Sequence, residues 1–520
     1  MDTKALRQKI LDLAIRGKLV PQDPNDEPAS VLLERIRAEK QQMVKDGKLK
    51  AKDIKNDSII FVGEDSLHYE KFADGTVKCI EDEIPFDVPE GWEWTRLSII
   101  CEPITDGTHQ TPTYSRDGYI FLSAKNVTTG KIDWDNVKYI LENLHNDLYK
   151  RIAPRYNDIL LAKNGTVGKA AIVDRDCVFD IYVTLAVLRI IKYLIPPKYL
   201  LYAISSSVVQ TFFKKSLIGI GVQNLHLEHI RRALIPIPPI EVQHRIVDCI
   251  ENYNAIIDSL ETDINIVKDT ISVAKSKILD LAIRGKLVPQ DPNDEPASVL
   301  LERIRAEKKE LIKQGKIKRD KKESVIFKGE DNSYYDDIPE SWSITSLGEL
   351  TTSLTLNDGD WILSDNMSPS GKVKLVQLGS VGSMQYIDKG FKYLTEEMFY
   401  KLSCTQIHPG YLLINRILSD KMCACILPEI NGKLITTVDT CWIAPDEEHY
   451  NIEYLLYAIS SPKFQAEVLM NSAGTTRKRI SKSNLIKLPI AFPPLAEQQR
   501  IIDAIENIFS KLDAIADNIS

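Results

Sequence analysis

The sequence predicts an α+β protein in which two mixed α/β domains are separated by a long antiparallel pair of coiled-coil helices, in a pseudo-two-fold, circular arrangement. Three observations lead to this prediction. A long segment is repeated letter for letter, a run of apolar residues near the middle has coiled-coil spacing, and strand-like patterns fill the segments between the repeats. Each variable segment with its flanks spans roughly 150 residues, which is long enough to build its own core.

The repeat marks equivalent positions in two halves of the chain. The segment ILDLAIRGKLVPQDPNDEPASVLLERIRAEK occupies residues 10–40 and again residues 278–308. Shorter matches follow each copy in the same order: IFVGED with IFKGED, VPEGWEWTRL with IPESWSITSL, YLLYAISS with itself, and PPIEVQHRIVDCIEN with PPLAEQQRIIDAIEN. Residues 98–198 and 348–453, which lie between these matches, share little. Alternating constant and variable segments indicate a duplicated architecture.

The constant segments are predicted to be helical. From residue 246 to residue 281 apolar residues recur at alternating spacings of four and three, the period of a coiled-coil seam. The C-terminal segment keeps this register, and residues 6–13 match residues 274–281, so the two terminal helices together are expected to pair with the central one. The residues expected to pack are Ile246, Ile250, Tyr253, Ile257, Leu260, Ile264, Val267, Ile501, Ile505, Ile508 and Leu512.

The remaining elements follow from local patterns. Residues 28–45 and 296–313 are predicted amphipathic helices, and the face with Leu32, Leu33 and Ile36 docks either on the protein's own surface or on a partner. FLSAKNV, DILLAKNG, AAIVD and TLAVLRI are predicted strands. The predicted divisions are an N-terminal helical region (1–46), a linker (47–83), a variable domain (84–238), a central helical region (239–314), a linker (315–335), a second variable domain (336–494) and a C-terminal helix (495–520).

Composition indicates a cytoplasmic protein. The eight cysteines are mostly scattered, no secretory signal opens the chain, and no apolar run reaches the length of a membrane span. Free thiols of this kind are typical of a reducing compartment. We therefore expect no membrane association.

The net charge of −7 is spread unevenly. Residues 151–232 hold twelve Lys and Arg against five Asp and Glu, and residues 471–487 hold five basic residues and no acid. Residues 241–270 hold seven acids and two bases. Basic clusters in both variable domains suit a DNA duplex held at two places, although solvated surfaces have the same composition.

Several loops carry groups that hydrogen-bond base edges or phosphates. TDGTHQTP (residues 105–112) and AGTTRKRISKSN (residues 473–484) are the main candidates. KNGTVGK (residues 163–169) lacks the first glycine and the Ser/Thr of a nucleotide-binding loop, which excludes that interpretation. The candidate DNA-contacting residues are Thr105, Asp106, Thr108, His109, Gln110, Lys125, Lys163, Asn164, Thr166, Lys169, Lys214, Lys215, Gln223, Asn224, Arg416, Thr475, Thr476, Arg477, Lys478, Arg479 and Lys482.

No catalytic or metal-binding constellation is expected. The Pro-Pro pairs are preceded by apolar residues, unlike those of an amino-methyltransferase, and the lone Pro-Asp dipeptide lacks the downstream Glu-x-Lys of a nuclease. His226 and His229 have no second ligand pair, so a surface helix or turn is expected there. The sequence thus favours binding over catalysis.

The combination of the repeat, DGTHQTP, the DVPEGWEW and DDIPESW segments and the two PP…RI segments resembles the specificity subunit of type I restriction–modification systems. The resemblance spans essentially the whole chain. It implies two target-recognition domains that each read half of a bipartite double-stranded DNA site. It also implies docking of two methyltransferase (M) subunits that bind S-adenosylmethionine, and of restriction (R) subunits that use ATP and Mg, while this chain binds no cofactor.

Two alternatives belong to other classes. A stand-alone, two-domain DNA-binding regulator without enzymatic partners would need no identical docking segments. A fused methyltransferase or nuclease would need the catalytic motifs noted above. One departure limits the resemblance: residues 218–225, IGIGVQNL, stand in the first domain where the second has AGTTRKRI, so a basic loop is expected only in the second.

Overall fold

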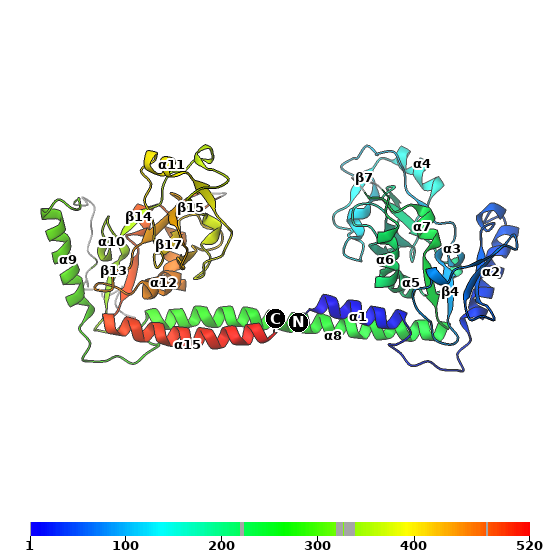
Figure 1. The fold of residues 1–520 in the computed structure, drawn as a ribbon, viewed down its shortest axis with the longest axis horizontal. Helices are drawn as coiled ribbons and strands as arrows, with labels where there is room; N and C mark the ends of the chain where they lie inside the picture. The colour runs from blue at the N-terminus through cyan, green and yellow to red at the C-terminus, as the bar shows by residue number, and fades with distance from the viewer. Residues whose placement is uncertain (1, 219–222, 319–325, 327–337, 475–476, 520) are drawn as a thin grey trace. The chain divides into compact units, whose positions relative to one another are not determined.

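The computed structural model describes residues 2–218, 223–318, 326, 338–474 and 477–519. The chain divides into two compact units, Met1–Asp263 (unit 1) and Ile264–Ser520 (unit 2). Helix α8 (Ile240–Ile283) has 44 residues and contributes its first half to unit 1 and its second half to unit 2 (Figure 1). The predicted α+β class, with two mixed domains and a long connecting helix, is confirmed.

Unit 1 contains a mixed domain above an antiparallel pair of helices, α1 and the first half of α8 (Figure 1). Its strands form the antiparallel pair β12-β4, the four-stranded sheet β5-β11-β8-β9 and the smaller sheets β1-β2-β3 and β10-β6-β7. The helices are α1 (Thr3–Ile15), α2 (Ala29–Lys45), α3 (Leu97–Ile100), α4 (Glu142–Arg151), α5 (Pro197–Ser205), α6 (Ser207–Lys215) and α7 (Leu227–Arg232). The strands are β1 (Ser58–Val62), β2 (His68–Phe72), β3 (Val77–Cys79), β4 (Glu93–Arg96), β5 (Thr105–Asp106), β6 (Tyr119–Leu122), β7 (Lys138–Ile140), β8 (Ile159–Ala162), β9 (Ala170–Ile172), β10 (Phe179–Ile181), β11 (Leu185–Leu188) and β12 (Leu234–Ile237).

Unit 2 repeats this layout with the second half of α8 and α15 (Figure 1). Its sheets are β13-β21, β14-β20-β17-β18 and β16-β15-β19. The helices are α9 (Ala297–Lys313), α10 (Leu347–Leu350), α11 (Glu396–Lys401), α12 (Ile452–Ser460), α13 (Pro462–Met470), α14 (Lys482–Leu485) and α15 (Leu495–Ile519). The strands are β13 (Ser343–Ser346), β14 (Leu356–Asp358), β15 (Val373–Val376), β16 (Lys392–Leu394), β17 (Leu412–Asn415), β18 (Ala424–Ile426), β19 (Lys433–Thr436), β20 (Thr440–Ile443) and β21 (Pro489–Phe492).

The repeated segment closes onto the loop before the first strand of each mixed domain. Gly17 has φ +68°, and a Cβ there would collide with the ring of Pro89; Gly285, with φ +65°, meets Pro339 in the same way. The amide of Ala29 donates to the Gly91 carbonyl at 2.9 Å, and the equivalent bond in unit 2 has the same length. Glycine is required because only it adopts this φ without a side chain that would clash.

The predicted amphipathic helices are confirmed as α2 and α9. Leu32, Leu33 and Ile36 are all buried against unit 1's own core. Docking of this face on the protein's own surface is therefore confirmed, and the partner-binding alternative for it is wrong.

Each terminal helix packs along its half of α8. In unit 1, Arg7 of α1 donates to Asn254 at 2.9 Å and to Asp258 at 2.6 Å. In unit 2, Lys275 of α8 forms a 2.5 Å ion pair with Asp513 of α15. The terminal helices run antiparallel to α8 (Figure 1).

The predicted seam of α8 and α15 is only partly buried. Ile246, Ile250 and Ile257 are buried, as are Ile501 and Ile505 of α15, while Ile264, Ile508 and Leu512 are half-buried. Tyr253, Leu260 and Val267, each seven residues apart, are 43%, 40% and 37% exposed. Their predicted packing is therefore wrong for this chain.

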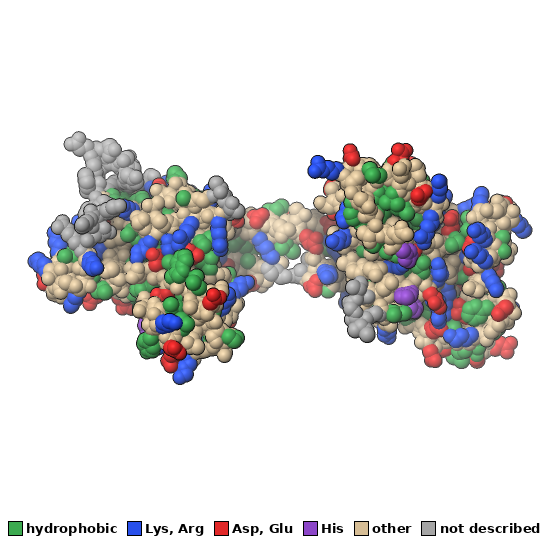
Figure 2. All heavy atoms as spheres, turned by 90° about the horizontal axis from the view of Figure 1, so that it is seen from above, with side chains coloured by type: hydrophobic (Ala, Val, Ile, Leu, Met, Phe, Trp, Pro, Cys, Tyr) green, Lys and Arg blue, Asp and Glu red, His purple; other side chains and the backbone are tan. Residues whose placement is uncertain are grey.

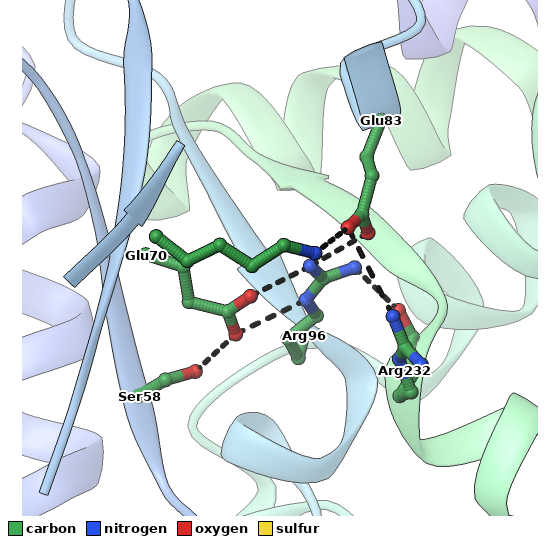
Figure 3. A network of polar contacts seen from close by, with 6 residues as sticks. Ser58, Glu70, Glu83, Arg96 and Arg232 are labelled. Carbon is green, nitrogen blue, oxygen red and sulfur yellow. Dashed lines mark hydrogen bonds and ion pairs between the residues drawn. The ribbon is translucent and has the colours of Figure 1, made fainter. Parts of the chain in front are cut away.

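The first predicted linker, residues 47–83, is wrong for most of its length, because this segment folds as β1-β2-β3. Ile60 and Ile80 bury against Trp94 of β4. Arg96 of β4 donates to Glu70 at 2.7 Å and to Glu83 at 2.8 Å, and Ser58 donates to Glu70 at 2.6 Å (Figure 3). In β1, SIIFV, the exposed residues are as apolar as the buried Ile60, so the sequence shows no alternation of apolar and polar residues.

When VPEGWEWTRL (residues 88–97) is aligned with IPESWSITSL (residues 338–347), Ser346 stands in place of Arg96 and Ile344 in place of Trp94. The side chains of β4 that hold the sheet β1-β2-β3, Trp94 and Arg96, are therefore present in unit 1 and not at the equivalent positions of unit 2. The second predicted linker, residues 315–335, lies largely outside the described residues.

Acid is expected to loosen β1-β2-β3. Burial alone would raise the pKa of Glu70, but hydrogen bonds from Arg96 and Ser58 hold that pKa below its ordinary value. The resulting stabilisation is full above the ordinary pKa of a glutamate and is lost as the pH falls through the lower folded-state pKa. Hydrogen exchange in residues 58–79, corrected for intrinsic rates, should accelerate in that acidic range.

Arg96→Met should produce the same loosening at neutral pH. Removing one partner of a buried ion pair costs about 3–5 kcal/mol because the other charge stays buried. Lys78→Met, which removes an exposed pair with Glu83, is the matched control and should change little. Equal exchange rates in the two variants would contradict this account.

Of the predicted strands, DILLAKNG, AAIVD and TLAVLRI contain β8, β9 and β11. FLSAKNV is a strand only in Phe121 and Leu122, because residues 124–127 form a 3-10 helix capped by Ser123. Among the described residues, none of the helices combines the length and the apolar character that crossing a membrane requires.

Candidate nucleic-acid interface

Three loops of unit 1 meet at the edge of the sheet β5-β11-β8-β9. They are residues 107–112 after β5, the turn 163–169 between β8 and β9, and the described residues 216–218 and 223–225 after α6. The amide of Leu225 donates to the Lys163 carbonyl at 2.9 Å, which joins the last two loops. Gln210 of α6 donates to the Gly168 carbonyl at 2.9 Å, which holds the turn against α6.

Asp106 lies at the centre of these loops. Its carboxylate forms a buried ion pair with the Lys163 ammonium, so two loops are linked through side chains. The same carboxylate lies 3.3 Å from His109 Nε2 and 3.8 Å from an Arg151 guanidinium nitrogen. The side chains of His109 and Arg151 are mostly exposed, so the Asp106 carboxylate orients side chains that reach solvent.

Unit 2 builds an equivalent arrangement on β14-β20-β17-β18. Arg416 follows β17 as Lys163 follows β8, and its Nε lies 3.1 Å from Asp358 at the end of β14. The amide of Ile480 donates to the Arg416 carbonyl at 3.0 Å. Lys482 donates to Asn357 at 2.6 Å. Ile480 therefore occupies the position in unit 2 that Leu225 occupies in unit 1.

The structure divides the predicted DNA-contacting residues by exposure. Exposed ones are His109, Gln110, Lys125, Thr166, Lys169, Lys214, Lys215, Gln223, Arg477, Lys478 and Arg479, and intermediate ones are Thr105, Thr108, Asn164, Asn224 and Lys482. Thr475 and Thr476 lie outside the described residues. The exposed set offers cations, amides and hydroxyls on the three loops and beside them.

Asp106, Lys163 and Arg416 are instead buried, at 4% exposure each. Their charged groups face one another or the protein backbone, so this conformation does not favour a direct contact with DNA, and that role stays a prediction. Sequence patterns cannot show this, because Asp106 and Lys163 lie 57 residues apart. An Asp-Gly dipeptide stands at residues 106–107 and 358–359, but also at 46–47, 74–75 and 117–118, so it could not by itself have identified the pairs.

The basic loop of unit 2 is available at the surface. Arg477 and Lys478 are exposed, and Arg479 is half-exposed beside Asp439, at 2.8 Å. Figure 2 shows Lys and Arg side chains over one face of each unit, interspersed with acidic ones. Exposed cations on loops suit phosphate contacts, which position a protein on DNA without reading sequence.

The described residues offer neither a metal site nor an activated thiol. They contain no group of three or more His, Cys, Asp and Glu side chains placed to hold a metal ion. Burial raises the pKa of Cys101 to about 12 and that of Cys404 to about 11, so these thiols stay protonated at neutral pH. Both cysteines therefore act as small apolar residues of the core.

Comparison with known proteins agrees with this geometry. A family model described as the type I restriction modification DNA specificity domain matches residues 89–268 and 339–520. The EcoEI specificity subunit of Escherichia coli is 27% identical, over 98% of this chain and 90% of that protein. The EcoAI specificity subunit of Escherichia coli is 32% identical, over 67% of this chain and 62% of that protein.

Among solved structures, a chain from a study of complex assembly and conformational transition of the type I R-M system is 19% identical. It has a TM-score of 0.49 and covers 84% of this chain and 94% of that one. The family model matches twice, and each match contains one mixed domain followed by one long helical segment, residues 240–268 of α8 or the whole of α15. The chain thus belongs to the type I restriction–modification DNA specificity family, as a specificity subunit with two recognition domains.

Proposed function

We propose that each unit reads one half of a bipartite DNA site through the loops at the edge of its four-stranded sheet. One observation carries this proposal: the same arrangement of a carboxylate paired with a buried cation beside the adjoining loops occurs in both units, while the exposed side chains differ. Hydrogen bonds to base edges specify sequence, so different loop residues on one scaffold suit different half-sites. The chain itself contributes recognition and no catalysis.

The two copies of the repeat are docking positions for two methyltransferase subunits. Their sequences are identical over 31 residues, and both copies pack against their own mixed domain through the same glycine and alanine contacts. Equal surfaces bind equal partners, which supports a ratio of two methyltransferase subunits per chain. Those subunits bind S-adenosylmethionine, restriction subunits bring ATP and Mg, and the complex works in the cytoplasm.

Co-purification with the methyltransferase subunit tests this function. We expect a complex with two methyltransferase subunits per chain by native mass spectrometry, and methylated adenines at a single bipartite motif when genomic DNA is sequenced. The chain without partners should show no methylation with S-adenosylmethionine and no cleavage with ATP and Mg.

Two outcomes would contradict the proposal. A ratio of one methyltransferase per chain would show that the two repeats are not equivalent docking positions. Sequence-specific DNA binding without any methyltransferase association would favour the stand-alone regulator.

A further inference from the structure

A carboxylate paired with a buried cation lies at the same place in both units. In unit 1, Asp106 ends the edge strand β5, and Lys163 is the first residue after β8. In unit 2, Asp358 ends the edge strand β14, and Arg416 is the first residue after β17. The two sheets have the same strand order, so the pairs are equivalent although one cation is lysine and the other arginine.

The carboxylate is placed by a glycine that follows it in both units. A Cβ on Gly107 would collide with the carbonyl of Ile181, and a Cβ on Gly359 would collide with the carbonyl of Thr437. The chain passes this close to the neighbouring backbone only where no side chain intervenes. The close approach of the glycine therefore fixes the position of the preceding Asp carboxylate beside the cation. It also fixes where the next loop begins.

The cation residue also holds the other loop through its backbone. The Lys163 amide donates to Thr184 at 2.8 Å, and its carbonyl accepts from Leu225 at 2.9 Å. Arg416 makes the matching bonds, donating to Asp439 at 2.8 Å and accepting from Ile480 at 3.0 Å. One residue in each unit thus joins the edge strand, the central strands and the loop that follows.

The side-chain pair is protected from solvent more fully in unit 1 than in unit 2. Lys163 is almost fully enclosed, whereas the Asp358 side chain is 29% exposed. Asp358 also accepts a hydrogen bond from the Cys441 thiol at 3.1 Å. Burial raises the pKa of that thiol, which keeps its proton available for donation.

We propose that Asp106–Lys163 and Asp358–Arg416 are positioning pairs that set the DNA-reading loops of each unit relative to one another. This inference rests on the proposed function, because it assigns the loops to DNA. The pair reads no base itself. It fixes where the exposed groups stand, and misplacing those groups weakens discrimination between bases more than it weakens attraction to phosphates.

The test compares buried and exposed cations of the same unit. The variant Lys163→Met removes the buried charge at similar volume, and Lys169→Met removes an exposed charge six residues further on. Each is assembled as the full chain with its methyltransferase partner. Binding is measured against the cognate site and against sites with single-base changes in each half, over a series of salt concentrations.

Lys163→Met should lower discrimination about ten-fold in one half-site only, with the salt dependence unchanged. Lys169→Met should instead reduce the slope of log K against log salt by about one if its ammonium contacts a phosphate. In unit 2, Arg416→Met removes the buried cation, and the triple variant Arg477→Ala, Lys478→Ala, Arg479→Ala removes exposed ones. The first should lower discrimination in the other half-site, and the second should reduce the salt slope.

Rescue distinguishes positioning from general loss of structure. Unit 2 shows that arginine serves in this place, so Lys163→Arg should restore discrimination, and so should Arg416→Lys. If Lys163→Met fails to fold, the double variant Asp106→Asn, Lys163→Met leaves no uncompensated charge and should fold yet discriminate poorly.

Two results would overturn the inference. A reduced salt slope in Lys163→Met would place its ammonium on a phosphate. Full discrimination in Lys163→Met, or in the folded double variant, would show that the pair does not set the loops. Absence of sequence-specific binding by the unaltered complex would contradict the proposed function instead, so the two failures are distinguishable.

Discussion

Exchanging residues 97–233 for the corresponding segment of another specificity subunit is expected to change one half of the recognised DNA site and leave the other half unaltered. The reason is topological. β4 and β12 pair antiparallel with Glu93 opposite Ile237, so the mixed domain of unit 1 begins and ends on adjacent strands. The residues between β4 and β12 can therefore differ between subunits while α1, α2 and α8 keep their sequence.

The junctions follow from the structure. The exchange retains β4, and with it Trp94 and Arg96, because these side chains hold β1-β2-β3 in place. A junction at residue 84 would bring in a foreign β4 and leave Glu70 without its partner. β13 and β21 frame unit 2 in the same way, which makes residues 347–488 the reciprocal exchange.

Methylome sequencing of cells that carry each exchanged subunit with its methyltransferase measures the result. The first exchange should alter one half-site, and the reciprocal exchange should alter the other. A change in both half-sites from a single exchange would contradict the assignment of one half-site to each unit.

Replacing Ile257 with Asp should destabilise unit 1 by about 3–5 kcal/mol. Ile257 is 2% exposed and packs within the largest apolar cluster of unit 1, on the seam between α8 and α1. A carboxylate there would lack a partner and would also remove the packed side chain. DNA affinity should fall with it, because α8 carries the mixed domain.

Ile256 provides a matched control. It is the same residue type on the same helix turn, but it is 56% exposed. Ile256→Asp should therefore change the unfolding free energy by no more than about 0.5 kcal/mol. Chemical unfolding of both variants gives the comparison, and similar losses of stability would mean that the seam is not where the structure places it.

The sequence alone was sufficient for features that depend on neighbouring residues along the chain. Exact repetition located two equivalent halves, and the period of 3.5 located α8 and α15. Runs such as DILLA and TLAVL marked β8 and β11, because a buried strand is apolar over its whole length. The loops proposed to contact DNA were also found in this way, since turn-forming residues and cations stand together in the sequence.

Tertiary structure decided the features that depend on residues far apart in the chain. Asp106 and Lys163 read as surface residues on polar loops until the fold placed one beside the other. Tyr253, Leu260 and Val267 match the apolar period as well as Ile250 and Ile257 do, yet in the fold they are exposed. Residues 47–83 looked like a linker because Ile60 and Glu70 gain their partners, Trp94 and Arg96, only when β4 lies against them. Periodicity reports which side of an element is apolar, whereas burial and charge pairing depend on what the fold brings to that side.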